Sequence, residues 1–360
     1  MVHALEALVR IESPSDDAEA QARLFTVLES WLTELDYTCT RPPGGSGTLM
    51  ARPAGSQGQP QQLIVAHTDT VWPHGTLQTR PFRFEGDRAW GPGTYDTKAG
   101  IVQAVFALRA LAACGQSPAL APVLLLNGDE EVGSPGTRTH VADAAQASQR
   151  AFVLEPSLGP EGHLKTARKG VGHFQIAIEG RAAHAGLNPE HGASATTELA
   201  HQILALQALN DPTRGISVNV APIWGGTRRN VVADAAGAQV DVRVRTAADG
   251  EAIAAAILAL TARTEGCTVV PSGRMVKAPM VRTPDSLALW DHAHRIATSM
   301  GWPLDHGAAG GGSDGNTTAL HCPTLDGLGA VGAGAHAEHE HVRIPELPKR
   351  AALLAALLLA

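Results

Sequence analysis

The stretch Leu63-Ile64-Val65-Ala66-His67-Thr68-Asp69 joins an apolar run to two polar side chains that could bind a metal ion. Four consecutive apolar residues predict a short buried strand, with His67 and Asp69 at its carboxyl end. In an open α/β sheet the active site lies outside the carboxyl ends of the strands. Asp69 could accept the second ring N–H of His67 and so fix the tautomer of a metal-binding imidazole. Taken alone, a His-x-Asp pair is more often structural or a surface coincidence.

Other apolar runs end in the same way, with a carboxylate or an imidazole after the run. The runs and their polar ends are 123–127 with Asp129-Glu130-Glu131, 151–154 with Glu155, and 332–335 with His336. Adjacent carboxylates repel one another, and burying them beside a strand is costly unless cations neutralise them. One of them can bind a metal ion while its neighbour accepts a proton from metal-bound water. Because these points share one relation to predicted strands, we interpret them as a single site.

Asp96 lies in a glycine-rich loop, residues 91–100, directly before apolar positions with helical spacing that begin at Ile101. An aspartate at a loop-to-helix junction is commonly a helix N-cap. Beside other ligands, the same carboxylate could bridge two cations. The sequence leaves both interpretations of Asp96 open.

These motifs together resemble the co-catalytic di-zinc peptidases, a family that includes aminoacylase, acetylornithine deacetylase, succinyl-diaminopimelate desuccinylase and the glutamate carboxypeptidases. The matching segments are Ala66-His67-Thr68-Asp69, Gly93-Thr94-Tyr95-Asp96-Thr97-Lys98-Ala99-Gly100, Asp129-Glu130-Glu131-Val132-Gly133, Leu154-Glu155-Pro156, Arg181-Ala182-Ala183-His184-Ala185-Gly186 and Gly334-Ala335-His336. The resemblance runs nearly end to end. Glu155, rather than an aspartate, is similar to the aminoacylase and glutamate carboxypeptidase side of the family.

The resemblance implies two zinc ions per subunit, which cobalt or manganese could replace. It implies the following ligands: His67 and Glu155 on one ion, Glu131 and His336 on the other, and Asp96 on both. Glu130 would be the general base, with Asp69 as a further catalytic residue beside His67. His336 also fits a His-small-x-x-Glu pattern, in which Glu340 is the acidic residue.

Three further positions follow from the same resemblance. His184 matches a lid-domain histidine that reaches the site of the partner subunit and stabilises the oxyanion. Asn230 and Arg274 resemble substrate-binding positions of the glutamate carboxypeptidases, although a solvated arginine is an equally ordinary use of Arg274. The basic residue that holds the glutamate side chain in those enzymes has no secure counterpart near 163–165.

The chain organisation predicts two domains, since 360 residues exceed the size at which a single core usually stops growing. Strand-like and helix-like segments alternate to about residue 165, which is typical of an α/β domain. We expect a discontinuous catalytic domain, 1–168 and 280–360, with a central mixed sheet. We expect residues 169–279 to form a smaller inserted α+β lid domain, with helices near 192–209 and 249–264. The resemblance implies a homodimer through this lid.

Composition excludes several other classes of protein. The formal charge is −7 without a lysine or arginine cluster, which argues against a nucleic-acid partner. The four cysteines form no Cys-x-x-Cys pair, so metals would have oxygen and nitrogen ligands. The N-terminus lacks the features of a signal peptide, and the apolar segment 351–360 is too short to cross a bilayer. We expect a cytoplasmic enzyme with no membrane partner.

The expected activity is zinc-dependent cleavage of an amide or peptide bond next to a C-terminal amino acid with a free carboxylate. An attacking hydroxide would lie between the metals, with Glu130 as base. Within the same chemistry, an N-acyl-amino-acid deacylase, a desuccinylase or a dipeptidase is the alternative.

Two remote alternatives remain. Gly311-Gly312-Ser313-Asp314-Gly315 matches the nucleophile elbow of serine hydrolases, and Asp326 and His336 follow in the right order. That motif requires a preceding strand, which we do not expect at 306–310. A non-catalytic binding protein on this fold is disfavoured because all the metal and base positions are present.

Overall fold

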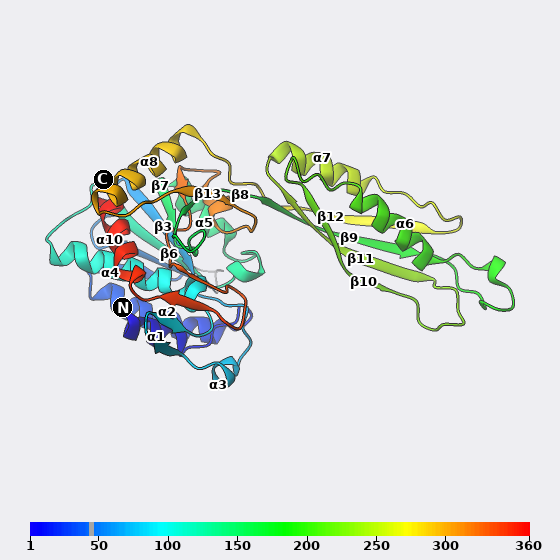
Figure 1. Cartoon of the computed structure of the whole chain (residues 1–360), viewed down its shortest axis with the longest axis horizontal. Helices are drawn as coiled ribbons and strands as arrows, with labels where there is room; N and C mark the ends of the chain where they lie inside the picture. The colour runs from blue at the N-terminus through cyan, green and yellow to red at the C-terminus, as the bar shows by residue number, and fades with distance from the viewer. Residues whose placement is uncertain (43–46) are drawn as a thin grey trace. The chain divides into compact units, whose positions relative to one another are not determined.

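A computed structural model describes residues 1–42 and 47–360 of the chain. The chain divides into two compact units, each with its own hydrophobic core. Unit 1 consists of Met1–Ala167, Arg282–Ala309 and Ser313–Ala360, and unit 2 consists of Arg168–Val281 and Gly310–Gly312. Figure 1 shows the helices and strands of each unit in chain order.

Unit 1 is built on a mixed six-stranded sheet with the order β1-β2-β6-β3-β7-β14. Its strands are β1 (Tyr37–Thr40), β2 (Thr48–Pro53), β3 (Gln61–His67), β6 (Ala121–Asn127), β7 (Ser148–Val153) and β14 (Thr324–Leu325). β3 pairs in parallel with β6 and β7, whereas β2 pairs antiparallel with β1 and β6. Every residue of β3 and β6 is buried, which explains the continuous apolar runs in the sequence.

Helices cover both faces of this sheet. They are α1 (Val2–Val9), α2 (Ala18–Thr33), α4 (Ala99–Ala113), α5 (Arg138–Gln146), α8 (Pro284–Ser299) and α10 (Glu346–Leu359). Ile64 of β3 belongs to the main core, to which α2, α4 and α10 also contribute. Leu63 and Val65, on the other face of the strand, belong to a separate cluster with Val141 of α5. The central strands are therefore held between two helical layers.

Unit 1 also contains two small sheets. One has the order β15-β16-β5-β4, made of β15 (Gly332–Ala333), β16 (His341–Arg343), β5 (Arg88–Trp90) and β4 (Arg83–Glu85). The other pairs β13 (His306–Ala309) with β8 (Leu164–Arg168). The expectation that 306–310 forms no strand was therefore wrong, because pairing with the distant β8 outweighs the glycine-rich local composition. The short helices are α3 (Thr76–Thr79) and α9 (Gly315–Thr318).

Unit 2 is an antiparallel four-stranded sheet with two helices. The strands, in the order β10-β11-β9-β12, are β10 (Ser217–Gly225), β11 (Ala235–Val244), β9 (Gly170–Glu179) and β12 (Thr268–Lys277). Alternate residues Phe174, Ile176 and Ile178 form a core with α6 (Ala195–Gln207) and α7 (Ala247–Leu258). The residues between them, such as His173 and Gln175, are exposed on the opposite face. This alternation is typical of an antiparallel sheet with one covered face.

The predicted fold class, an α/β unit with a central mixed sheet together with a smaller α+β unit, is confirmed. The second helix of unit 2 is shorter than predicted and ends at Leu258. No helix in the described ranges, 1–42 and 47–360, is long and apolar enough to cross a membrane.

Candidate metal centre

Parallel strands bring the candidate ligands to one edge of the unit 1 sheet. β3 ends at His67, β6 is followed by a single helical turn at Glu130–Val132, and β7 is followed by Glu155. Since β3 pairs in parallel with both neighbours, these three carboxyl ends lie at the same edge. Asp96 and His336 reach the same place from loops.

Asp96 lies between two imidazoles. Its Oδ1 is 3.0 Å from His67 Nε2, and its Oδ2 is 3.4 Å from His336 Nε2. Each imidazole also faces a carboxylate of its own, with Glu155 Oε1 3.5 Å from His67 Nε2 and Glu131 Oε2 2.9 Å from His336 Nε2. The geometry is that of two neighbouring metal sites that share one carboxylate. Asp96 is not a helix N-cap, because α4 begins after Lys98 and has no side-chain cap.

The hydrogen bonding of His67 leaves the correct nitrogen for a metal. His67 is 2% exposed, and its Nδ1 lies 3.0 Å from the backbone oxygen of Asp69. A carbonyl oxygen can only accept, so Nδ1 carries the proton and Nε2 presents its lone pair to the site. The predicted contact with the Asp69 carboxylate is also present, since Asp69 Oδ1 lies 3.3 Å from the same nitrogen.

The Asp69 carboxylate also accepts hydrogen bonds from the backbone of the two adjacent glutamates. It is fully buried and accepts the backbone N–H of Glu130 at 3.2 Å and of Glu131 at 3.0 Å. Ser15 Oγ donates to it at 2.7 Å. Asp69 therefore positions both glutamates of the turn that follows β6.

The clustered carboxylates of the site favour a bound positive charge. Burial by itself would lower the pKa of His67, but hydrogen bonds to Asp69 and Asp96 raise it. Hydrogen bonds to Asp96 and Glu131 raise the pKa of His336 to about 10. Burial opposes ionisation of Asp96, yet the two imidazoles lower its pKa. Divalent cations could replace these protons as the counter-charge, and imidazole with carboxylate is a donor set that suits zinc and related metals.

Distances alone do not show which of Glu130 and Glu131 binds a metal ion and which acts as the general base. Ligand atoms of His67, Glu130 and Glu155 lie within 4.8 Å of one another, and so do those of His67, Asp96 and Glu131. Glu130 could thus reach a metal ion as well as a water molecule. Its assignment as a base rests on the family resemblance rather than on distance.

Glu340 supports the loop of Asp96 through contacts that the sequence did not reveal. Its carboxylate is 2% exposed and accepts the backbone N–H groups of Gly93 at 2.8 Å, Tyr95 at 2.9 Å and Asp96 at 3.1 Å. The indole of Trp72 donates to it at 3.0 Å. Burial raises the pKa of Glu340, and these donors oppose the rise. Glu340 thereby shapes the loop that presents Asp96; only its spacing from His336 marked it in the sequence.

The structure does not support Ser313 as a nucleophile. Ser313 is fully buried, donates to Asp326 at 2.6 Å and accepts from the N–H of Gly315 at 2.9 Å. His336, the proposed base of that alternative, faces Asp96 and Glu131 instead. A strand does precede this segment, but a hydroxyl enclosed in this way cannot reach a substrate.

Three predicted site residues belong to unit 2. His184 is exposed and its Nδ1 accepts the N–H groups of Gly186 at 3.1 Å and Leu187 at 3.2 Å, which leaves Nε2–H as a donor. The backbone oxygen of Asn230 accepts the N–H of Ala185, so Asn230 lies beside His184. Arg274 lies apart from this loop, on β12.

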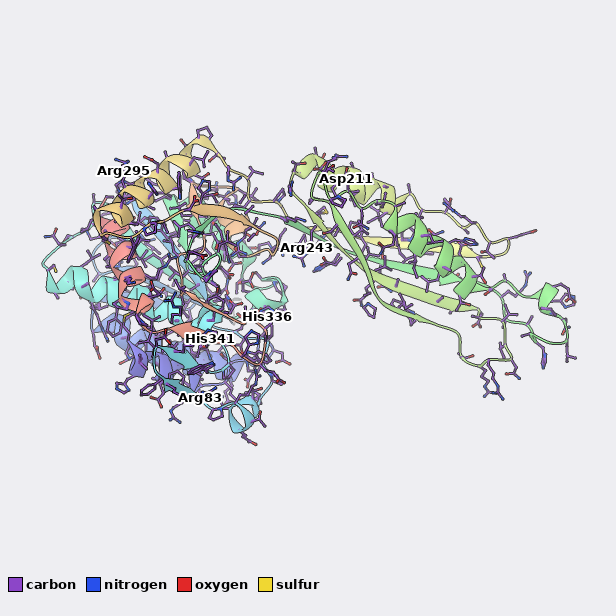
Figure 2. The ribbon with its side chains drawn as sticks, in the orientation of Figure 1. Arg83, Asp211, Arg243, Arg295, His336 and His341 are labelled. Carbon is purple, nitrogen blue, oxygen red and sulfur yellow. The ribbon has the colours of Figure 1, made fainter. Side chains whose placement is uncertain are left out.

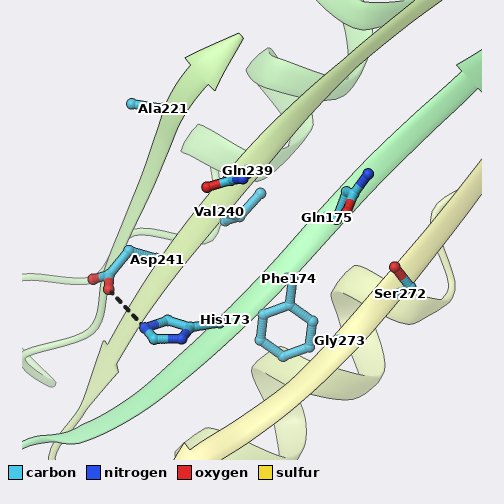
Figure 3. A pocket seen from close by; sticks show the side chains of 9 residues that line it. All are labelled: His173, Phe174, Gln175, Ala221, Gln239, Val240, Asp241, Ser272 and Gly273. Atoms are coloured by element: carbon cyan, nitrogen blue, oxygen red, sulfur yellow. Dashed lines mark ion pairs between the residues drawn. The ribbon is translucent and has the colours of Figure 1, made fainter. Parts of the chain in front are cut away.

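On the open face of the unit 2 sheet, Arg274 is the register partner of His173. His173 lies 3.7 Å from Asp241 on the next strand, and the two side chains face one another in Figure 3. They line an open hollow of about 480 Å³ together with Gln175, Gln239 and Ser272. Arg274 therefore stands beside a polar hollow of the sheet and on a different element from His184 and Asn230.

An α/β unit with imidazole and carboxylate ligands at the ends of parallel strands, joined to a smaller α+β unit, defines a metal-dependent hydrolase. Residues 63–360 match the model of peptidase family M20/M25/M40, and the chain belongs to this family. The chain is 30% identical to carboxypeptidase G2 of a Pseudomonas species over all of this chain and 88% of that protein. It is 27% identical to a succinyl-diaminopimelate desuccinylase of Dinoroseobacter shibae, over 97% of this chain and 96% of that protein.

Solved structures show the same fold. Aminopeptidase PepT of Bacillus cereus superposes with a TM-score of 0.81 at 23% identity, covering 99% of this chain and 96% of that one. YXEP of Bacillus subtilis, described as a dinuclear metal-binding peptidase of this family, gives a TM-score of 0.72 at 16% identity with 99% and 96% coverage. The chain is thus a metallo-hydrolase, and the family is metal-dependent.

Proposed function

We propose that this metallo-hydrolase binds two metal ions and cleaves an amide or peptide bond next to an amino acid with a free α-carboxylate, in the manner of a carboxypeptidase. The observation that carries this proposal is Asp96, whose two oxygens face two different imidazoles. The likeness to carboxypeptidase G2 over the whole chain supports the choice of substrate class.

The proposed ligands are those that the family resemblance implies, and the distances are compatible with them. His67 and Glu155 would hold one ion, Glu131 and His336 the other, and Asp96 both. We propose zinc in both sites, with cobalt or manganese as substitutes, because two imidazoles and carboxylates are ligands that these metals share. The ions would supply Lewis-acid activation of water and of the scissile carbonyl.

The chain's own residues supply the proton transfers. Glu130 would take a proton from the attacking water and pass it to the leaving amine. Its backbone N–H is fixed by Asp69, which limits the positions its carboxylate can take. His184 would donate its Nε2–H to the oxyanion in the site of a partner subunit, in a homodimer formed through unit 2. Asn230 and Arg274 would contact the substrate.

A deacylase, a desuccinylase or a dipeptidase is the second candidate, since all of them need the same water activation. The likeness to a succinyl-diaminopimelate desuccinylase favours keeping this candidate. Only the groups on either side of the scissile bond distinguish it from a carboxypeptidase.

The test is hydrolysis of a panel by the metal-loaded protein and by Glu130→Ala. The panel comprises an N-acylglutamate, an N-acylalanine, N-acetylornithine, N-succinyl-diaminopimelate and Gly-Glu. All of these compounds carry a free α-carboxylate, so we expect the wild type to cleave at least one of them, with a loss of about 10²–10⁴-fold in the variant. The metal content of both proteins, measured by mass spectrometry, should be two ions per chain. A wild type that holds two ions and cleaves nothing in the panel would refute the substrate class.

A further inference from the structure

A hollow of about 480 Å³ opens in unit 1 beside the loops that carry two of the candidate metal ligands. We call it the Arg80 hollow; Arg80, Arg83, Trp90, Gly91, Pro92 and His339 are among the residues that line it. Gly91 and Pro92 lead into the loop of Asp96, and His339 follows His336 by three residues. The hollow thus shares both loops with the metal centre. Figure 2 labels Arg83, His336 and His341 in this part of unit 1.

Two tryptophans hold the arginines of this hollow. The guanidinium carbon of Arg80 lies 3.7 Å from the ring centre of Trp72, and that of Arg83 lies 4.2 Å from the ring centre of Trp90. Stacking on an aromatic face fixes the guanidinium plane while its N–H groups stay available at the edge. Preorganised guanidinium groups lose little freedom when they bind a planar carboxylate.

These guanidinium groups are scarcely neutralised within the protein. Arg80 is partly buried, yet within residues 1–42 and 47–360 its guanidinium has a stacking contact with Trp72 and no hydrogen bond or ion pair. Arg83 lies 3.7 Å from Glu85, a pair in which the side chains are 56% and 82% exposed and which water therefore weakens. Glu338 also lines the hollow and offsets one of the two positive charges. Among the lining residues, the two arginines outnumber the single carboxylate of Glu338, while Glu85, outside the lining, balances part of the charge of Arg83.

A short series of contacts connects the Arg80 hollow to the metal centre. The indole N–H of Trp72, the ring on which Arg80 stacks, donates to Glu340 at 3.0 Å. Glu340 in turn accepts the backbone N–H of Asp96 at 3.1 Å. A group bound by Arg80 would therefore have a fixed position relative to the carboxylate that bridges the two sites.

We infer that the Arg80 hollow binds a second carboxylate of the substrate, distinct from the α-carboxylate beside the scissile amide. The inference rests on the proposed function, and it narrows the substrate to a molecule with two carboxylates. The second carboxylate belongs either to the side chain of the released amino acid or to the far end of the acyl group. Both sources offer the same planar anion to Arg80 and Arg83.

Binding can be measured without catalysis. Glutarate and the neutral glutaramide would be titrated by calorimetry into the metal-loaded wild type, Arg80→Gln/Arg83→Gln and Arg88→Gln. Arg88 is an exposed arginine of the same hairpin that does not line the hollow, so it is the matched control. We expect the double variant to bind glutarate at least about 10-fold more weakly, with Arg88→Gln unchanged and no response to glutaramide. Equal glutarate affinities in the wild type and the double variant would place the anion on the metals and overturn the inference.

Folding of the variants is checked by metal content and melting temperature. The single variant Arg83→Gln alters the more exposed of the two arginines and provides a second, milder test. It should weaken glutarate binding by a smaller factor, and an unchanged affinity would remove Arg83 from the site.

Kinetics then identify the source of the carboxylate. The matched pairs are N-acetylglutamate with N-acetylglutamine, and N-succinylalanine with N-succinamoylalanine. We expect the double variant to lose about 10–100-fold in kcat/KM for the charged member of one pair, and less than about 3-fold for the neutral members. Loss for N-acetylglutamate would identify a side-chain carboxylate, and loss for N-succinylalanine an acyl carboxylate. Equal losses for charged and neutral members would overturn the inference. If the wild type cleaves none of the four compounds, the proposed function fails. Calorimetry would then still decide whether the anion binds.

Discussion

The two units of the chain differ in how their polar side chains are arranged. In unit 1, the central strands are buried on both faces and end in a group of imidazoles and carboxylates around a shared space. In unit 2, the sheet has one apolar face under α6 and α7, and polar residues such as His173 and Gln175 line its exposed face. Unit 1 therefore gathers carboxylates and imidazoles that a cation could bridge, whereas unit 2 shows no such group among its described residues.

The buried carboxylates show the same contrast. Glu198 of unit 2 is fully buried, and it accepts the N–H groups of Arg263 at 3.0 Å and Thr264 at 2.6 Å. It closes a loop of its own unit. Asp96 and Glu131 of unit 1 lie instead against imidazoles that a metal could displace. The difference teaches that burial alone does not identify a functional carboxylate; the chemistry of its partners does.

The largest effect that tests the contrast is expected in unit 2, at His184. If catalysis needs this residue, His184→Ala should lower kcat by about 10²–10³-fold, the usual cost of one oxyanion donor. Its side chain is exposed, so the melting temperature should stay the same. His191→Ala, an exposed histidine nearby in the chain, is the control. An unchanged kcat in His184→Ala would mean that residues of unit 1 alone carry out the chemistry.

Removal of the metal should destabilise unit 1 and leave the stability of unit 2 unchanged. At free metal 100-fold above its dissociation constant, one site contributes about 2.7 kcal/mol to the free energy of unfolding. We expect a chelator to reduce hydrogen-exchange protection in β3 and β6 and to leave β9 and β11 unchanged. Similar losses in both units would show that their stabilities are coupled.

Much of the fold could be predicted from the sequence because its strongest signals are local. The buried run at Leu63–Ala66 predicted β3, and the spacing from Ile101 to Leu111 predicted α4. The end of α7 was predicted poorly. The apolar pattern continues beyond Leu258, but the Glu198 carboxylate binds the backbone of Arg263 and Thr264 and draws the chain toward α6. That contact is tertiary and leaves no local signal.

The residues of the candidate site also differ in whether the sequence could predict them. The residues that the structure gathers around Asp96 lie at the ends of predicted strands or in a recognisable glycine-rich loop, so their motifs are visible in the sequence. The contacts of Glu340 with the Asp96 backbone and with Trp72 were not visible in the sequence, because they join segments far apart in the chain. Proximity in sequence to a ligand, as for Glu340, does not reveal which backbone groups a carboxylate will bind.

Glu340→Gln tests whether this hidden contact matters. The amide would place an N–H₂ group or a weaker acceptor against three backbone N–H groups, so the loop of Asp96 should shift. We expect metal affinity to fall by about 10–100-fold, as for other residues that orient a metal ligand. Competition with a fluorescent chelator measures it, with the exposed Glu161→Gln as the control. Equal metal affinity in the two variants would restrict Glu340 to a structural role.

The smallest expected effect is the pH dependence of the metal-free protein, which should differ between the units. The pKa of His336 is raised to about 10 by Asp96 and Glu131, above its ordinary value of 6.5. Its contribution to stability is therefore complete below about pH 6.5 and is lost as the pH rises through about 10. The pKa of Asp96 is lowered by the imidazoles against the effect of burial, so its contribution is lost only in acid, as the pH falls below 3.8.

Below about pH 9, where the Cys267 thiol stays protonated, unit 2 should respond to acid alone. Burial opposes ionisation of Glu198, but hydrogen bonds from Gln202, Thr264 and Arg263 lower its pKa below 4.5, so its contribution is present at all higher pH values. In a Trp224→Phe protein, the remaining tryptophans all belong to unit 1, so their fluorescence in urea reports that unit. We expect the metal-free unfolding midpoint to fall between pH 6.5 and 8, the range below the pKa of about 8 to which burial lowers Lys98, and added zinc to remove most of that fall because the metal takes over the role of the protons. A midpoint that is constant over this range without metal would mean that the imidazoles of unit 1 do not neutralise its carboxylates, and the contrast between the two units would then lose its electrostatic basis.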